Sequence, residues 1–518
     1  MAAQWLKDAV FYEIYPQSFL DTNADGIGDI NGIIEKLDYI HSLGCNALWI
    51  NPCFDSPFKD AGYDVRDYLK VAPRYGDNND LYRLFGEAHK RGIRVLLDLV
   101  PGHTSEEHEW FHQSQKVEKN EFTNRYIWTD FCFQGAKDLP YIGGESERSA
   151  TYILNFFKCQ PALNYGFLKP EEPWQLGIDH PDAIATREAI KNVMRFWLSH
   201  GCDGFRVDMA ASLVKYDDDQ KSGTSAIWRN VREMLDAEYP DAAMVSEWSN
   251  PPLALRAGYD MDFCLNHPQQ GGYSSLMRDY GMPGLFEKED NSYFRKDAQA
   301  RDIRRFTDQY LSWYEDTRNI GYISLLTCNH DTVRPRYNLD VNELKLAYAF
   351  LFTMPGVPFL YYGDEIGMRY LSLPTKEGGY FRTGSRTPMQ WSSGKNLGFS
   401  DAQADALYLP VDDAPDAPTV EAQESDPTSL LNTVRALLAL RHQEEDLQAD
   451  AEFRVVCAEP DHPFVYQRGT LTLAINPSAQ EATVELPEKG KSVLYSIGDV
   501  SLSNGILHLP AQSFAVIQ

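Results

Sequence analysis

The sequence predicts an α/β protein whose main domain is a closed (β/α)8 barrel, a TIM barrel. Short apolar strand-like runs alternate with amphipathic helical stretches over about the first 440 residues, a pattern typical of βα units that build a parallel sheet. There are eight such runs, and eight units over more than about 250 residues favour a closed barrel. A doubly wound open sheet is the alternative, but no GxGxxG motif follows the first run.

The predicted barrel strands can be placed individually. They are residues 9–15, 47–51, 94–100, 203–208, 242–248, 259–266, 322–328 and 357–363. Helical patterns fall between most of them, for example at 183–200, 223–237 and 341–354.

Two stretches depart from this alternation. About a hundred residues separate the third and fourth strands, far more than a connecting helix needs, and they are rich in aromatic residues and glycine. After a helix at 428–442, seven short alternating segments separated by turn residues indicate an antiparallel β-sandwich. We therefore expect a barrel from residues 1–102 and 182–445, an inserted subdomain at 103–181 and a C-terminal sandwich at 446–518.

Charge and composition narrow the function classes. The chain has 518 residues, with 48 Lys and Arg against 75 Asp and Glu, which gives a formal charge of −27. Nucleic-acid binding depends on clustered basic residues, so a nucleic-acid partner is not expected. A neutral substrate such as a sugar is compatible with this charge.

The chain carries no sign of export or of membrane insertion. Its N-terminus lacks a basic region followed by an apolar stretch. The longest apolar run, 347–363, is interrupted by Thr353, Pro355, Gly356 and Pro358, so no membrane span is expected. The eight cysteines form no CxxC pair, and we expect free thiols and a cytoplasmic location. Nothing in the sequence indicates the oligomeric state.

Polar residues stand at the ends of several predicted strands, where the active sites of such barrels lie. Asp98 and then His103 follow the third strand, and Arg206 and Asp208 end the fourth. Glu247 ends the fifth strand, and the seventh runs into Asn329, His330 and Asp331.

Three carboxylates from different strand ends fit the cleavage of a glycosidic bond. One can act as nucleophile, one as a general acid with a raised pKa, and a third can steady the charged transition state. Arg206 lies two residues from Asp208, so both side chains point to the same face of the strand and the cation favours the ionised carboxylate. Ordinary structural salt bridges are the alternative for any one of these residues.

The segments GFRVDMA, SEW and CNHD closely resemble conserved segments of the α-amylase family, glycoside hydrolase family 13. DLVPGHTS and GYDVRDY are similar to further segments of that family. The resemblance implies that Asp208 is the nucleophile, Glu247 the general acid/base and Asp331 the stabiliser of the transition state. It also implies that His103, Arg206 and His330 line the subsite of the attacked sugar.

Two further matches point to a subgroup. FKDAGYD contains Asp60 and Tyr63, and RTPMQW, which is similar to oligo-1,6-glucosidase-like and trehalose synthase-like members, contains Arg386. The resemblance implies that Asp60 and Arg386 form an ion pair that closes the pocket at the non-reducing sugar, above a stacking Tyr63. An aromatic ring against the C–H face of glucose buries apolar area and leaves the hydroxyls to polar partners.

Three positions depart from the family pattern. Gly102 stands where the family usually has Asn, which puts a calcium site between barrel and insertion in doubt. Ala162 stands where relatives often carry Asp, and Met209 follows the nucleophile position where relatives tend to carry Val, Ala or Thr. The linkage preference therefore stays open.

A loop after the first strand, DTNADGIGD at 21–29, has the alternating oxygen ligands of a calcium loop. The donors are Asp21, Asn23, Asp25, the Ile27 carbonyl and Asp29. Position twelve is Gly32 instead of Glu, so a true EF-hand is not expected. A similar loop binds calcium in oligo-1,6-glucosidase-like members, which implies one structural Ca²⁺; an Asx-rich turn without an ion is the alternative.

The expected function is hydrolysis of α-glucosidic bonds in short gluco-oligosaccharides, with an exo-acting α-glucosidase favoured. A trehalose synthase-like transglycosylase or isomerase and an endo-acting α-amylase remain alternatives on the same residues. A non-catalytic transporter subunit is disfavoured, because all three carboxylates are present and no membrane helix is predicted.

Overall fold

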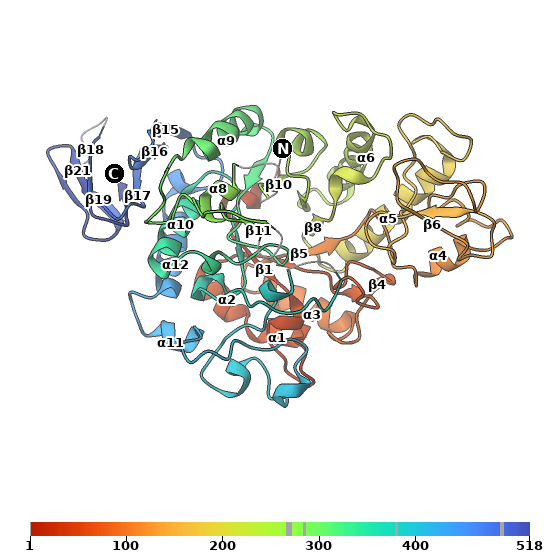
Figure 1. Ribbon diagram of the computed structural model, residues 1–518, viewed down its shortest axis with the longest axis horizontal. Coiled ribbons are helices and arrows are strands. Elements are labelled where there is room, and N and C mark those ends of the chain that lie inside the picture. Colours follow the sequence, from red (N-terminus) through yellow and green to blue (C-terminus); the bar gives the residue numbers. More distant parts are fainter. Residues whose placement is uncertain (1, 266–271, 283–285, 379–381, 487–491) are drawn as a thin grey trace.

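The computed structural model describes residues 2–265, 272–282, 286–378, 382–486 and 492–518. Its centre is a barrel of eight parallel strands, with helices around it (Figure 1). All eight predicted strands are present, in the hydrogen-bonded order β13-β10-β9-β8-β5-β2-β1-β14. A parallel bridge between Leu326 and Phe359 joins the two ends of this sheet and closes the barrel. The strands are β1 Phe11–Ile14, β2 Ala47–Ile50, β5 Arg94–Leu99, β8 Gly204–Val207, β9 Ala243–Ser246, β10 Met261–Phe263, β13 Tyr322–Ser324 and β14 Phe359–Tyr361.

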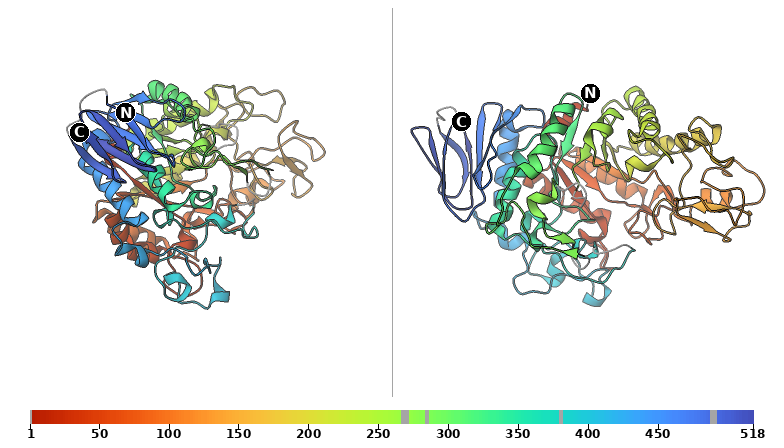
Figure 2. Two further views of the ribbon diagram at one scale, coloured as in Figure 1. Left: turned by 60° about the vertical axis from the view of Figure 1, so that its left-hand side comes forward. Right: turned by 45° about the horizontal axis from the view of Figure 1, so that its top comes forward.

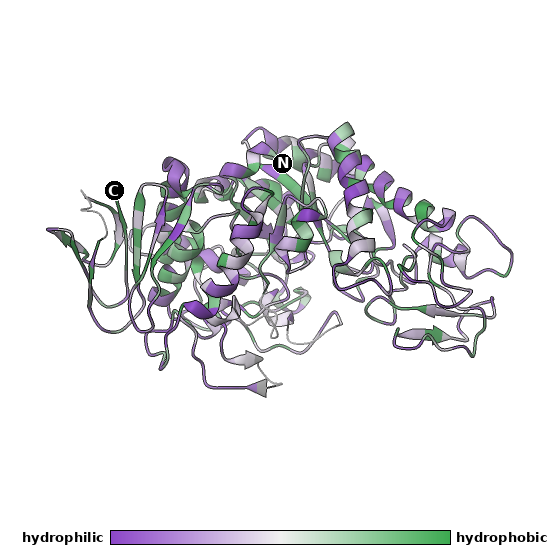
Figure 3. Ribbon diagram, turned by 90° about the horizontal axis from the view of Figure 1, so that it is seen from above, coloured by the Kyte–Doolittle hydropathy of each residue, from purple (hydrophilic) through white to green (hydrophobic). Residues whose placement is uncertain are grey.

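The barrel strands are buried on both faces and mostly apolar, because one face lines the barrel interior and the other is covered by helices. In Figure 3 the helices around them carry both hydrophilic and hydrophobic stretches, as amphipathic helices do. The covering helices are α1 Ile30–Glu35, α2 Leu37–Leu43, α3 Asn78–His89, α5 Pro181–Ser199, α6 Ser222–Glu238, α7 Pro251–Arg256, α8 Ser274–Met277, α9 Arg304–Thr317, α10 Val341–Thr353, α11 Val420–Glu424 and α12 Leu430–Gln443.

Between β5 and α5 the chain forms the excursion that its length predicts, and Figure 1 shows it at one end of the molecule. It contains α4 Glu109–Ser114 and the antiparallel pair β6 Tyr141–Gly143 and β7 Thr151–Ile153. Most of its remaining backbone is irregular. A second short pair, β3 Phe54–Asp55 and β4 Asp67–Val71, lies in the connection after β2, and a third, β11 Gly281–Met282 and β12 Phe286–Glu287, in the connection after β10.

The C-terminal strands form two antiparallel sheets at the opposite end of the molecule from the insertion (Figure 2). One sheet has the order β15-β16-β17-β22-β19 and the other β18-β21-β20. Among the described residues these two sheets contain eight strands, one more than the seven segments predicted. The strands are β15 Phe453–Cys457, β16 Phe464–Arg468, β17 Leu471–Asn476, β18 Ala482–Glu485, β19 Val493–Ile497, β20 Ser501–Ser503, β21 Ile506–Leu509 and β22 Ser513–Ile517.

The larger C-terminal sheet packs on the barrel through α10. The rings of Phe350 and Phe464 lie 6.1 Å apart, and the hydroxyls of Thr353 and Tyr466 lie 2.6 Å apart. Phe453, Tyr466 and Phe514 belong to the same hydrophobic core as the barrel strands. Within the described residues, no helix combines the length and the apolar character that a membrane crossing needs.

Candidate active site

The polar residues predicted at the strand ends lie together at the carboxyl side of the barrel. The parallel register aligns them: Asp98 on β5 pairs with Arg206 on β8. Val207 pairs with Ser246, so the residues that follow them, Asp208 and Glu247, leave neighbouring strands at the same level. Adjacent parallel strands thus present these four side chains at one rim.

Gly204 allows β8 and β9 to approach each other this closely. Its φ is 150°, and a Cβ at this position would lie 1.9 Å from the carbonyl oxygen of Ala243. Such a contact is far inside van der Waals distance, so a side chain here would push the two strands apart. The glycine therefore permits the pairing of β8 and β9, the two strands that lead to Asp208 and Glu247.

Arg206 is the central cation of this rim. It is fully buried, and its Nη1 lies 3.0 Å from Asp98 Oδ1 and 3.0 Å from Asp208 Oδ1, while its Nη2 lies 2.9 Å from Glu247 Oε2. One guanidinium thus serves three carboxylates. The planar fork of arginine suits this arrangement, because its five donors are fixed in direction.

Asp208 and Glu247 both contact Arg206, and the side chain of Asp208 is the more buried of the two. Burial and the negative charge of Glu247 raise the pKa of Asp208, and Arg206 only partly opposes this rise. Met209, which follows Asp208, has a left-handed backbone with φ 43°, and its amide donates to Glu247 Oε2 at 3.0 Å. A left-handed conformation is unusual for an unbranched side chain of this size, and here it directs a backbone donor at the second carboxylate.

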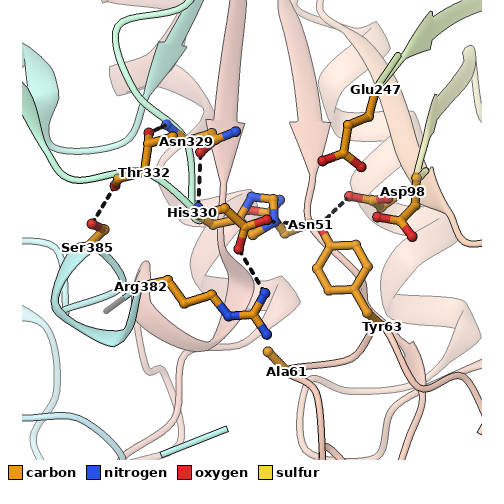
Figure 4. A network of polar contacts seen from close by, with 12 residues as sticks. Asn51, Ala61, Tyr63, Asp98, Glu247, Asn329, His330, Thr332, Arg382 and Ser385 are labelled. Atoms are coloured by element: carbon orange, nitrogen blue, oxygen red, sulfur yellow. Dashed lines mark hydrogen bonds and ion pairs between the residues drawn. The ribbon is translucent and has the colours of Figure 1, made fainter. Parts of the chain in front are cut away.

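Asp331 occupies the opposite electrostatic setting across the site. Arg382 Nη1 lies 3.0 Å and Arg386 Nη2 2.8 Å from its Oδ1, and His330 Nε2 lies 3.3 Å from its Oδ2. Burial alone would raise the pKa of Asp331, but these three neighbours hold it well below its usual range. In Figure 4, Arg382 and His330 lie on one side of the site, and Glu247 and Asp98 lie across from them.

The predicted pairing of Asp60 with Arg386 is wrong. Asp60 instead forms its ion pair with Arg382, and Gln160 from the insertion donates to its second oxygen at 2.7 Å. Arg386 points to Asp331 and donates from Nε to the His330 carbonyl at 2.8 Å. Both arginines belong to the segment after β14, four residues apart, and the sequence motif alone did not show which of them faces Asp60.

Tyr63 lies inside the cluster beside His330. Their rings are stacked with centroids 5.3 Å apart, and the Tyr63 hydroxyl lies 3.0 Å from Asp98 Oδ2 and 2.7 Å from His330 Nε2. The tyrosine is 4% exposed. Its hydroxyl therefore connects the Arg206 side of the site with the Asp331 side.

His103 is fixed as a neutral imidazole. Its Nε2 donates to the Tyr63 carbonyl at 3.0 Å, its Nδ1 lies 3.0 Å from Asn155 Nδ2, and burial lowers its pKa to about 4. Because the amide of Asn155 can only donate from Nδ2, Nδ1 is the acceptor. Asn155 also accepts from Lys215 Nζ at 2.9 Å, so the insertion supplies a side chain that orients a residue of the site.

Three residues of this cluster were missed by sequence reasoning. Arg382 could have been found from the pair of arginines in FRTGSR, and Asn155 only from the fold, because nothing near it in the sequence marks it. Glu13 on β1 lies 2.9 Å from His330 Nδ1. An acidic residue inside an otherwise apolar predicted strand was the available signal.

The predicted metal loop lies apart from these residues and packs against the segment 399–408. Asp21 accepts from the backbone amides of Asn23, Ala24 and Gly26 at 3.1, 2.8 and 2.8 Å, and from Ser400 Oγ at 2.5 Å. Asn23 and Asp25 each accept from the amide two residues later, at 3.0 and 2.8 Å.

Asp29 caps α1 through the Gly32 amide at 2.8 Å. In the part of the chain that the structure describes, no group of three or more His, Cys, Asp or Glu side chains is placed to hold a metal ion. The oxygen-rich donor set of the loop nevertheless has the chemistry that calcium prefers.

Comparison with known proteins agrees with this geometry. A family model described as alpha amylase, catalytic domain, matches residues 13–450. Trehalose synthase/amylase TreS of Mycolicibacterium smegmatis is 34% identical over 488 residues, which cover 85% of this chain and 77% of that protein. Oligo-1,6-glucosidase of Heyndrickxia coagulans is 28% identical over 557 aligned positions, which cover 95% of each chain.

The fold is also found among solved structures. A mutant of trehalulose synthase MutB in complex with Tris superposes with a TM-score of 0.81 at 25% identity, covering 99% of this chain and 100% of that one. The match to the catalytic-domain model spans well over half of the chain, and it includes every strand of the barrel except the first two residues of β1. The protein is therefore a member of the α-amylase family of glycoside hydrolases.

Proposed function

We propose that this glycoside hydrolase is an exo-acting α-glucosidase that cleaves short α-linked gluco-oligosaccharides with retention of configuration. The observation that carries the proposal is the contrast between the carboxylates at one barrel rim. Asp208 and Glu247 share a single guanidinium, whereas Asp331 is surrounded by two arginines and a histidine. Retaining glycosidases need two neighbouring carboxyl groups, one ionised and one that carries a proton, and Asp331 adds a permanent anion across the site.

In the first half of the proposed reaction, Asp208 attacks the anomeric carbon and the glycosidic C–O bond breaks. Glu247 gives its proton to the departing sugar oxygen, so a neutral alcohol leaves and a glucosyl ester forms on Asp208. Arg206 contacts both carboxyls, which suits it to favour the ionised nucleophile while the proton stays on the acid.

In the second half, Glu247 takes a proton from water and the hydroxide oxygen attacks the same carbon. The ester bond to Asp208 breaks and the free carboxylate returns, so that two inversions give net retention of the α-configuration. Asp331, held anionic by its neighbours, would oppose the positive charge that develops on the sugar ring in both steps.

The exo-type assignment is supported by the ion pair of Asp60 and Arg382. Asp60 comes from the connection after β2 and Arg382 from the segment after β14, and Arg382 also binds Asp331. We expect the pair to bind the hydroxyls of the terminal sugar and to block extension beyond it, with the Tyr63 ring beneath that sugar.

Isomerisation by internal transglycosylation is the second candidate. It is favoured by the 34% identity with trehalose synthase/amylase TreS, which is higher than the 28% identity with oligo-1,6-glucosidase. The same covalent intermediate would pass its glucosyl unit to a sugar hydroxyl instead of water. The difference between the two candidates is the acceptor, not the carboxylates.

The deciding experiment follows the products by proton NMR from the first seconds of reaction with maltose, isomaltose, trehalose, sucrose and maltotriose. The proposal predicts glucose that is released as the α-anomer. Trehalose formed from maltose in excess of glucose would identify the isomerase instead. Early β-glucose would exclude retention, and rapid loss of viscosity in starch would indicate an endo-acting amylase.

We also propose that the loop 21–29 binds one structural Ca²⁺ ion through Asp21, Asn23, Asp25, the Ile27 carbonyl and Asp29. The support is the donor chemistry, which consists of three carboxylates and two neutral oxygens at alternate positions. The ion would neutralise like charges within nine residues and tie the loop to the segment 399–408 that it packs against.

A further inference from the structure

Glu13 is a buried carboxylate on β1 that neither proposed reaction step uses. It is 0% exposed, and its Oε1 lies 2.9 Å from His330 Nδ1 and 3.2 Å from Asn51 Nδ2. Its other oxygen has no hydrogen-bond partner among the described residues. Burying a carboxylate oxygen without a hydrogen-bond partner lowers the free energy of unfolding. Glu13 therefore reduces the stability of the fold, which points to a functional reason for its presence.

We propose that Glu13 is a positioning residue that keeps both ring nitrogens of His330 protonated, so that an imidazolium lies beside Asp331. The inference deepens the proposed glycosidase function and rests on it for its kinetic consequences.

The proton on His330 Nε2 follows from the Tyr63 hydroxyl. That hydroxyl has a single proton and lies 3.0 Å from Asp98 Oδ2, which also accepts from Trp49 Nε1 at 3.1 Å. Asp98 also forms an ion pair with Arg206 at 3.0 Å. As an ionised carboxylate it can only accept, so Tyr63 donates to it. The hydroxyl oxygen is left with lone pairs only, so the 2.7 Å contact between it and Nε2 requires a proton on Nε2.

The proton on Nδ1 follows from Glu13. With Glu13 ionised, a lone pair on Nδ1 would face a carboxylate oxygen at 2.9 Å with no hydrogen between them. Asn51 Nδ2 lies 3.1 Å from Nδ1, but it is also 3.2 Å from Glu13 Oε1, to which it can donate. Both ring nitrogens are then donors, each directed at an acceptor of its own.

The groups around the ring are consistent with this charge. Carboxylates face it from β1 (Glu13), from its own loop (Asp331) and from β5 (Asp98), and Arg386 donates to its backbone carbonyl. Tyr15 and Trp49 also pack on the ring, and Arg206 lies behind Tyr63. Burial acts against the charged form, but Asp331 and Glu13 outweigh it and raise the pKa of His330.

The consequence concerns Asp331. A doubly protonated His330 adds a cation 3.3 Å from Asp331 Oδ2. Without Glu13, His330 would lose the Nδ1 proton at lower pH. Asp331 would then lose one of its three stabilising partners.

The direct test is nitrogen NMR of ¹⁵N-histidine-labelled full-length protein without substrate, with the His330 signal assigned from a His330→Gln variant. In the wild type at pH 7 both nitrogens of His330 should show the shifts of an imidazolium. A neutral ring at pH 7 would overturn the proposal whatever the variants do. Because no substrate is present, this result is independent of which reaction the enzyme catalyses.

The variant Glu13→Gln keeps the shape and the acceptor oxygen but removes the charge. It should lower the titration midpoint of His330 by one pH unit or more, equivalent to about a tenfold change in proton affinity. The alkaline limb of kcat/KM should move to lower pH by a similar amount, while kcat/KM near pH 5 stays within about twofold of the wild type.

Glu365→Gln is the matched control. Glu365 is equally buried, but its carboxylate accepts from the hydroxyls of Tyr12 and Tyr39, both at 2.7 Å. It should leave the His330 signal and the alkaline limb unchanged. If Glu13→Gln folds and also leaves both unchanged, Glu13 has no part in the protonation of His330. If it does not fold, the wild-type spectrum decides.

Discussion

The two sides of the active-site rim use the same residue type in opposite electrostatic settings. On the side of β5, β8 and β9, three carboxylates share the single guanidinium of Arg206. On the side of β13 and β14, Asp331 has two arginines and a histidine around it. The anion-rich side favours retention of a proton, and the cation-rich side prevents it.

This difference in charged neighbours shows that the surroundings of a carboxyl group, and not its chemical type, determine its protonation. The pKa of Asp208 is raised by burial and by Glu247, and that of Asp331 is lowered by its cations. Asp208 and Glu247 can therefore hold one proton between them, which Glu247 donates in the proposed reaction, while Asp331 stays a permanent anion.

The largest expected effect comes from removing one carboxylate on each side. Asp208→Asn and Asp331→Asn should each lower kcat/KM for maltose by about 10⁴-fold, as loss of a member of a catalytic set commonly does. Their melting temperatures should separate them. Asp208→Asn relieves a crowded group of anions and should melt at or above the wild-type temperature. Asp331→Asn removes the anion that Arg382, Arg386 and His330 share and should melt lower by about 2–4 °C.

The pH dependence of these melting temperatures sharpens the comparison. Asp331, with a lowered folded pKa, contributes stability that is present above its unfolded pKa of about 4 and is lost as the pH falls further. Asp208, with a raised folded pKa, destabilises the fold increasingly as the pH rises above about 4. Calorimetry from pH 3 to 8 should therefore show the two differences from wild type growing with pH in opposite directions. If both differences from wild type changed in the same direction with pH, the two carboxylates would not lie in opposite electrostatic settings.

A smaller effect is expected from Glu247→Gln, and it should depend on the leaving group. Loss of general acid catalysis should lower kcat for maltose by about 10²–10⁴-fold. With 4-nitrophenyl α-glucoside the first step needs little protonation, so its rate constant should fall much less, and a burst of nitrophenol should precede slow turnover. Stopped-flow absorbance measures both phases. An equal loss for both substrates would mean that Glu247 is not the acid.

Arg382→Gln tests whether the ion pair with Asp60 holds the terminal sugar. KM for maltose should rise about tenfold, which corresponds to 1.4 kcal/mol of binding, while longer oligosaccharides become relatively better substrates. Arg369→Gln is the control, because Arg369 lies in the same segment but pairs with Asp412. If Arg386→Gln changes chain-length preference and Arg382→Gln does not, the pocket is closed by the other arginine.

The smallest effect on the chemistry is expected from chelation, since the loop 21–29 shares no contact with either side of the rim among those described above. EDTA should lower the melting temperature, and added calcium should restore it through preferential binding to the folded state. The rate constant of the first chemical step should change less than twofold. A loss of turnover at unchanged melting temperature would contradict a structural role for the ion.

The sequence predicted the barrel well, because each strand is marked by its own apolar segment and the number of such segments can be counted along the chain. It also predicted which residues end the strands, since Asp98, Asp208 and Glu247 follow directly from strand order. It failed where two similar side chains compete for one partner, as Arg382 and Arg386 do near Asp60 and Asp331. Which arginine faces which carboxylate depends on the path of the segment after β14, and no periodicity encodes that path.

The same limit explains why Asn155 and Glu13 were missed. Asn155 reaches His103 only because the insertion folds back onto the barrel. Glu13 contacts His330 across 317 positions of sequence. Contacts of this kind are set by barrel closure, which the strand pattern predicts as a whole but not residue by residue.

The space beside Gly102 has a consequence for building chimeras of this enzyme. A Cβ at Gly102 would lie 2.7 Å from Asn155 Nδ2, the atom that holds His103. The barrel and the insertion are therefore not interchangeable parts, because a residue on one side of the junction has been fitted to a residue on the other. An insertion grafted from a relative that carries a larger residue at the matching position should fold onto the barrel but leave His103 misdirected, unless positions 102 and 155 are exchanged together.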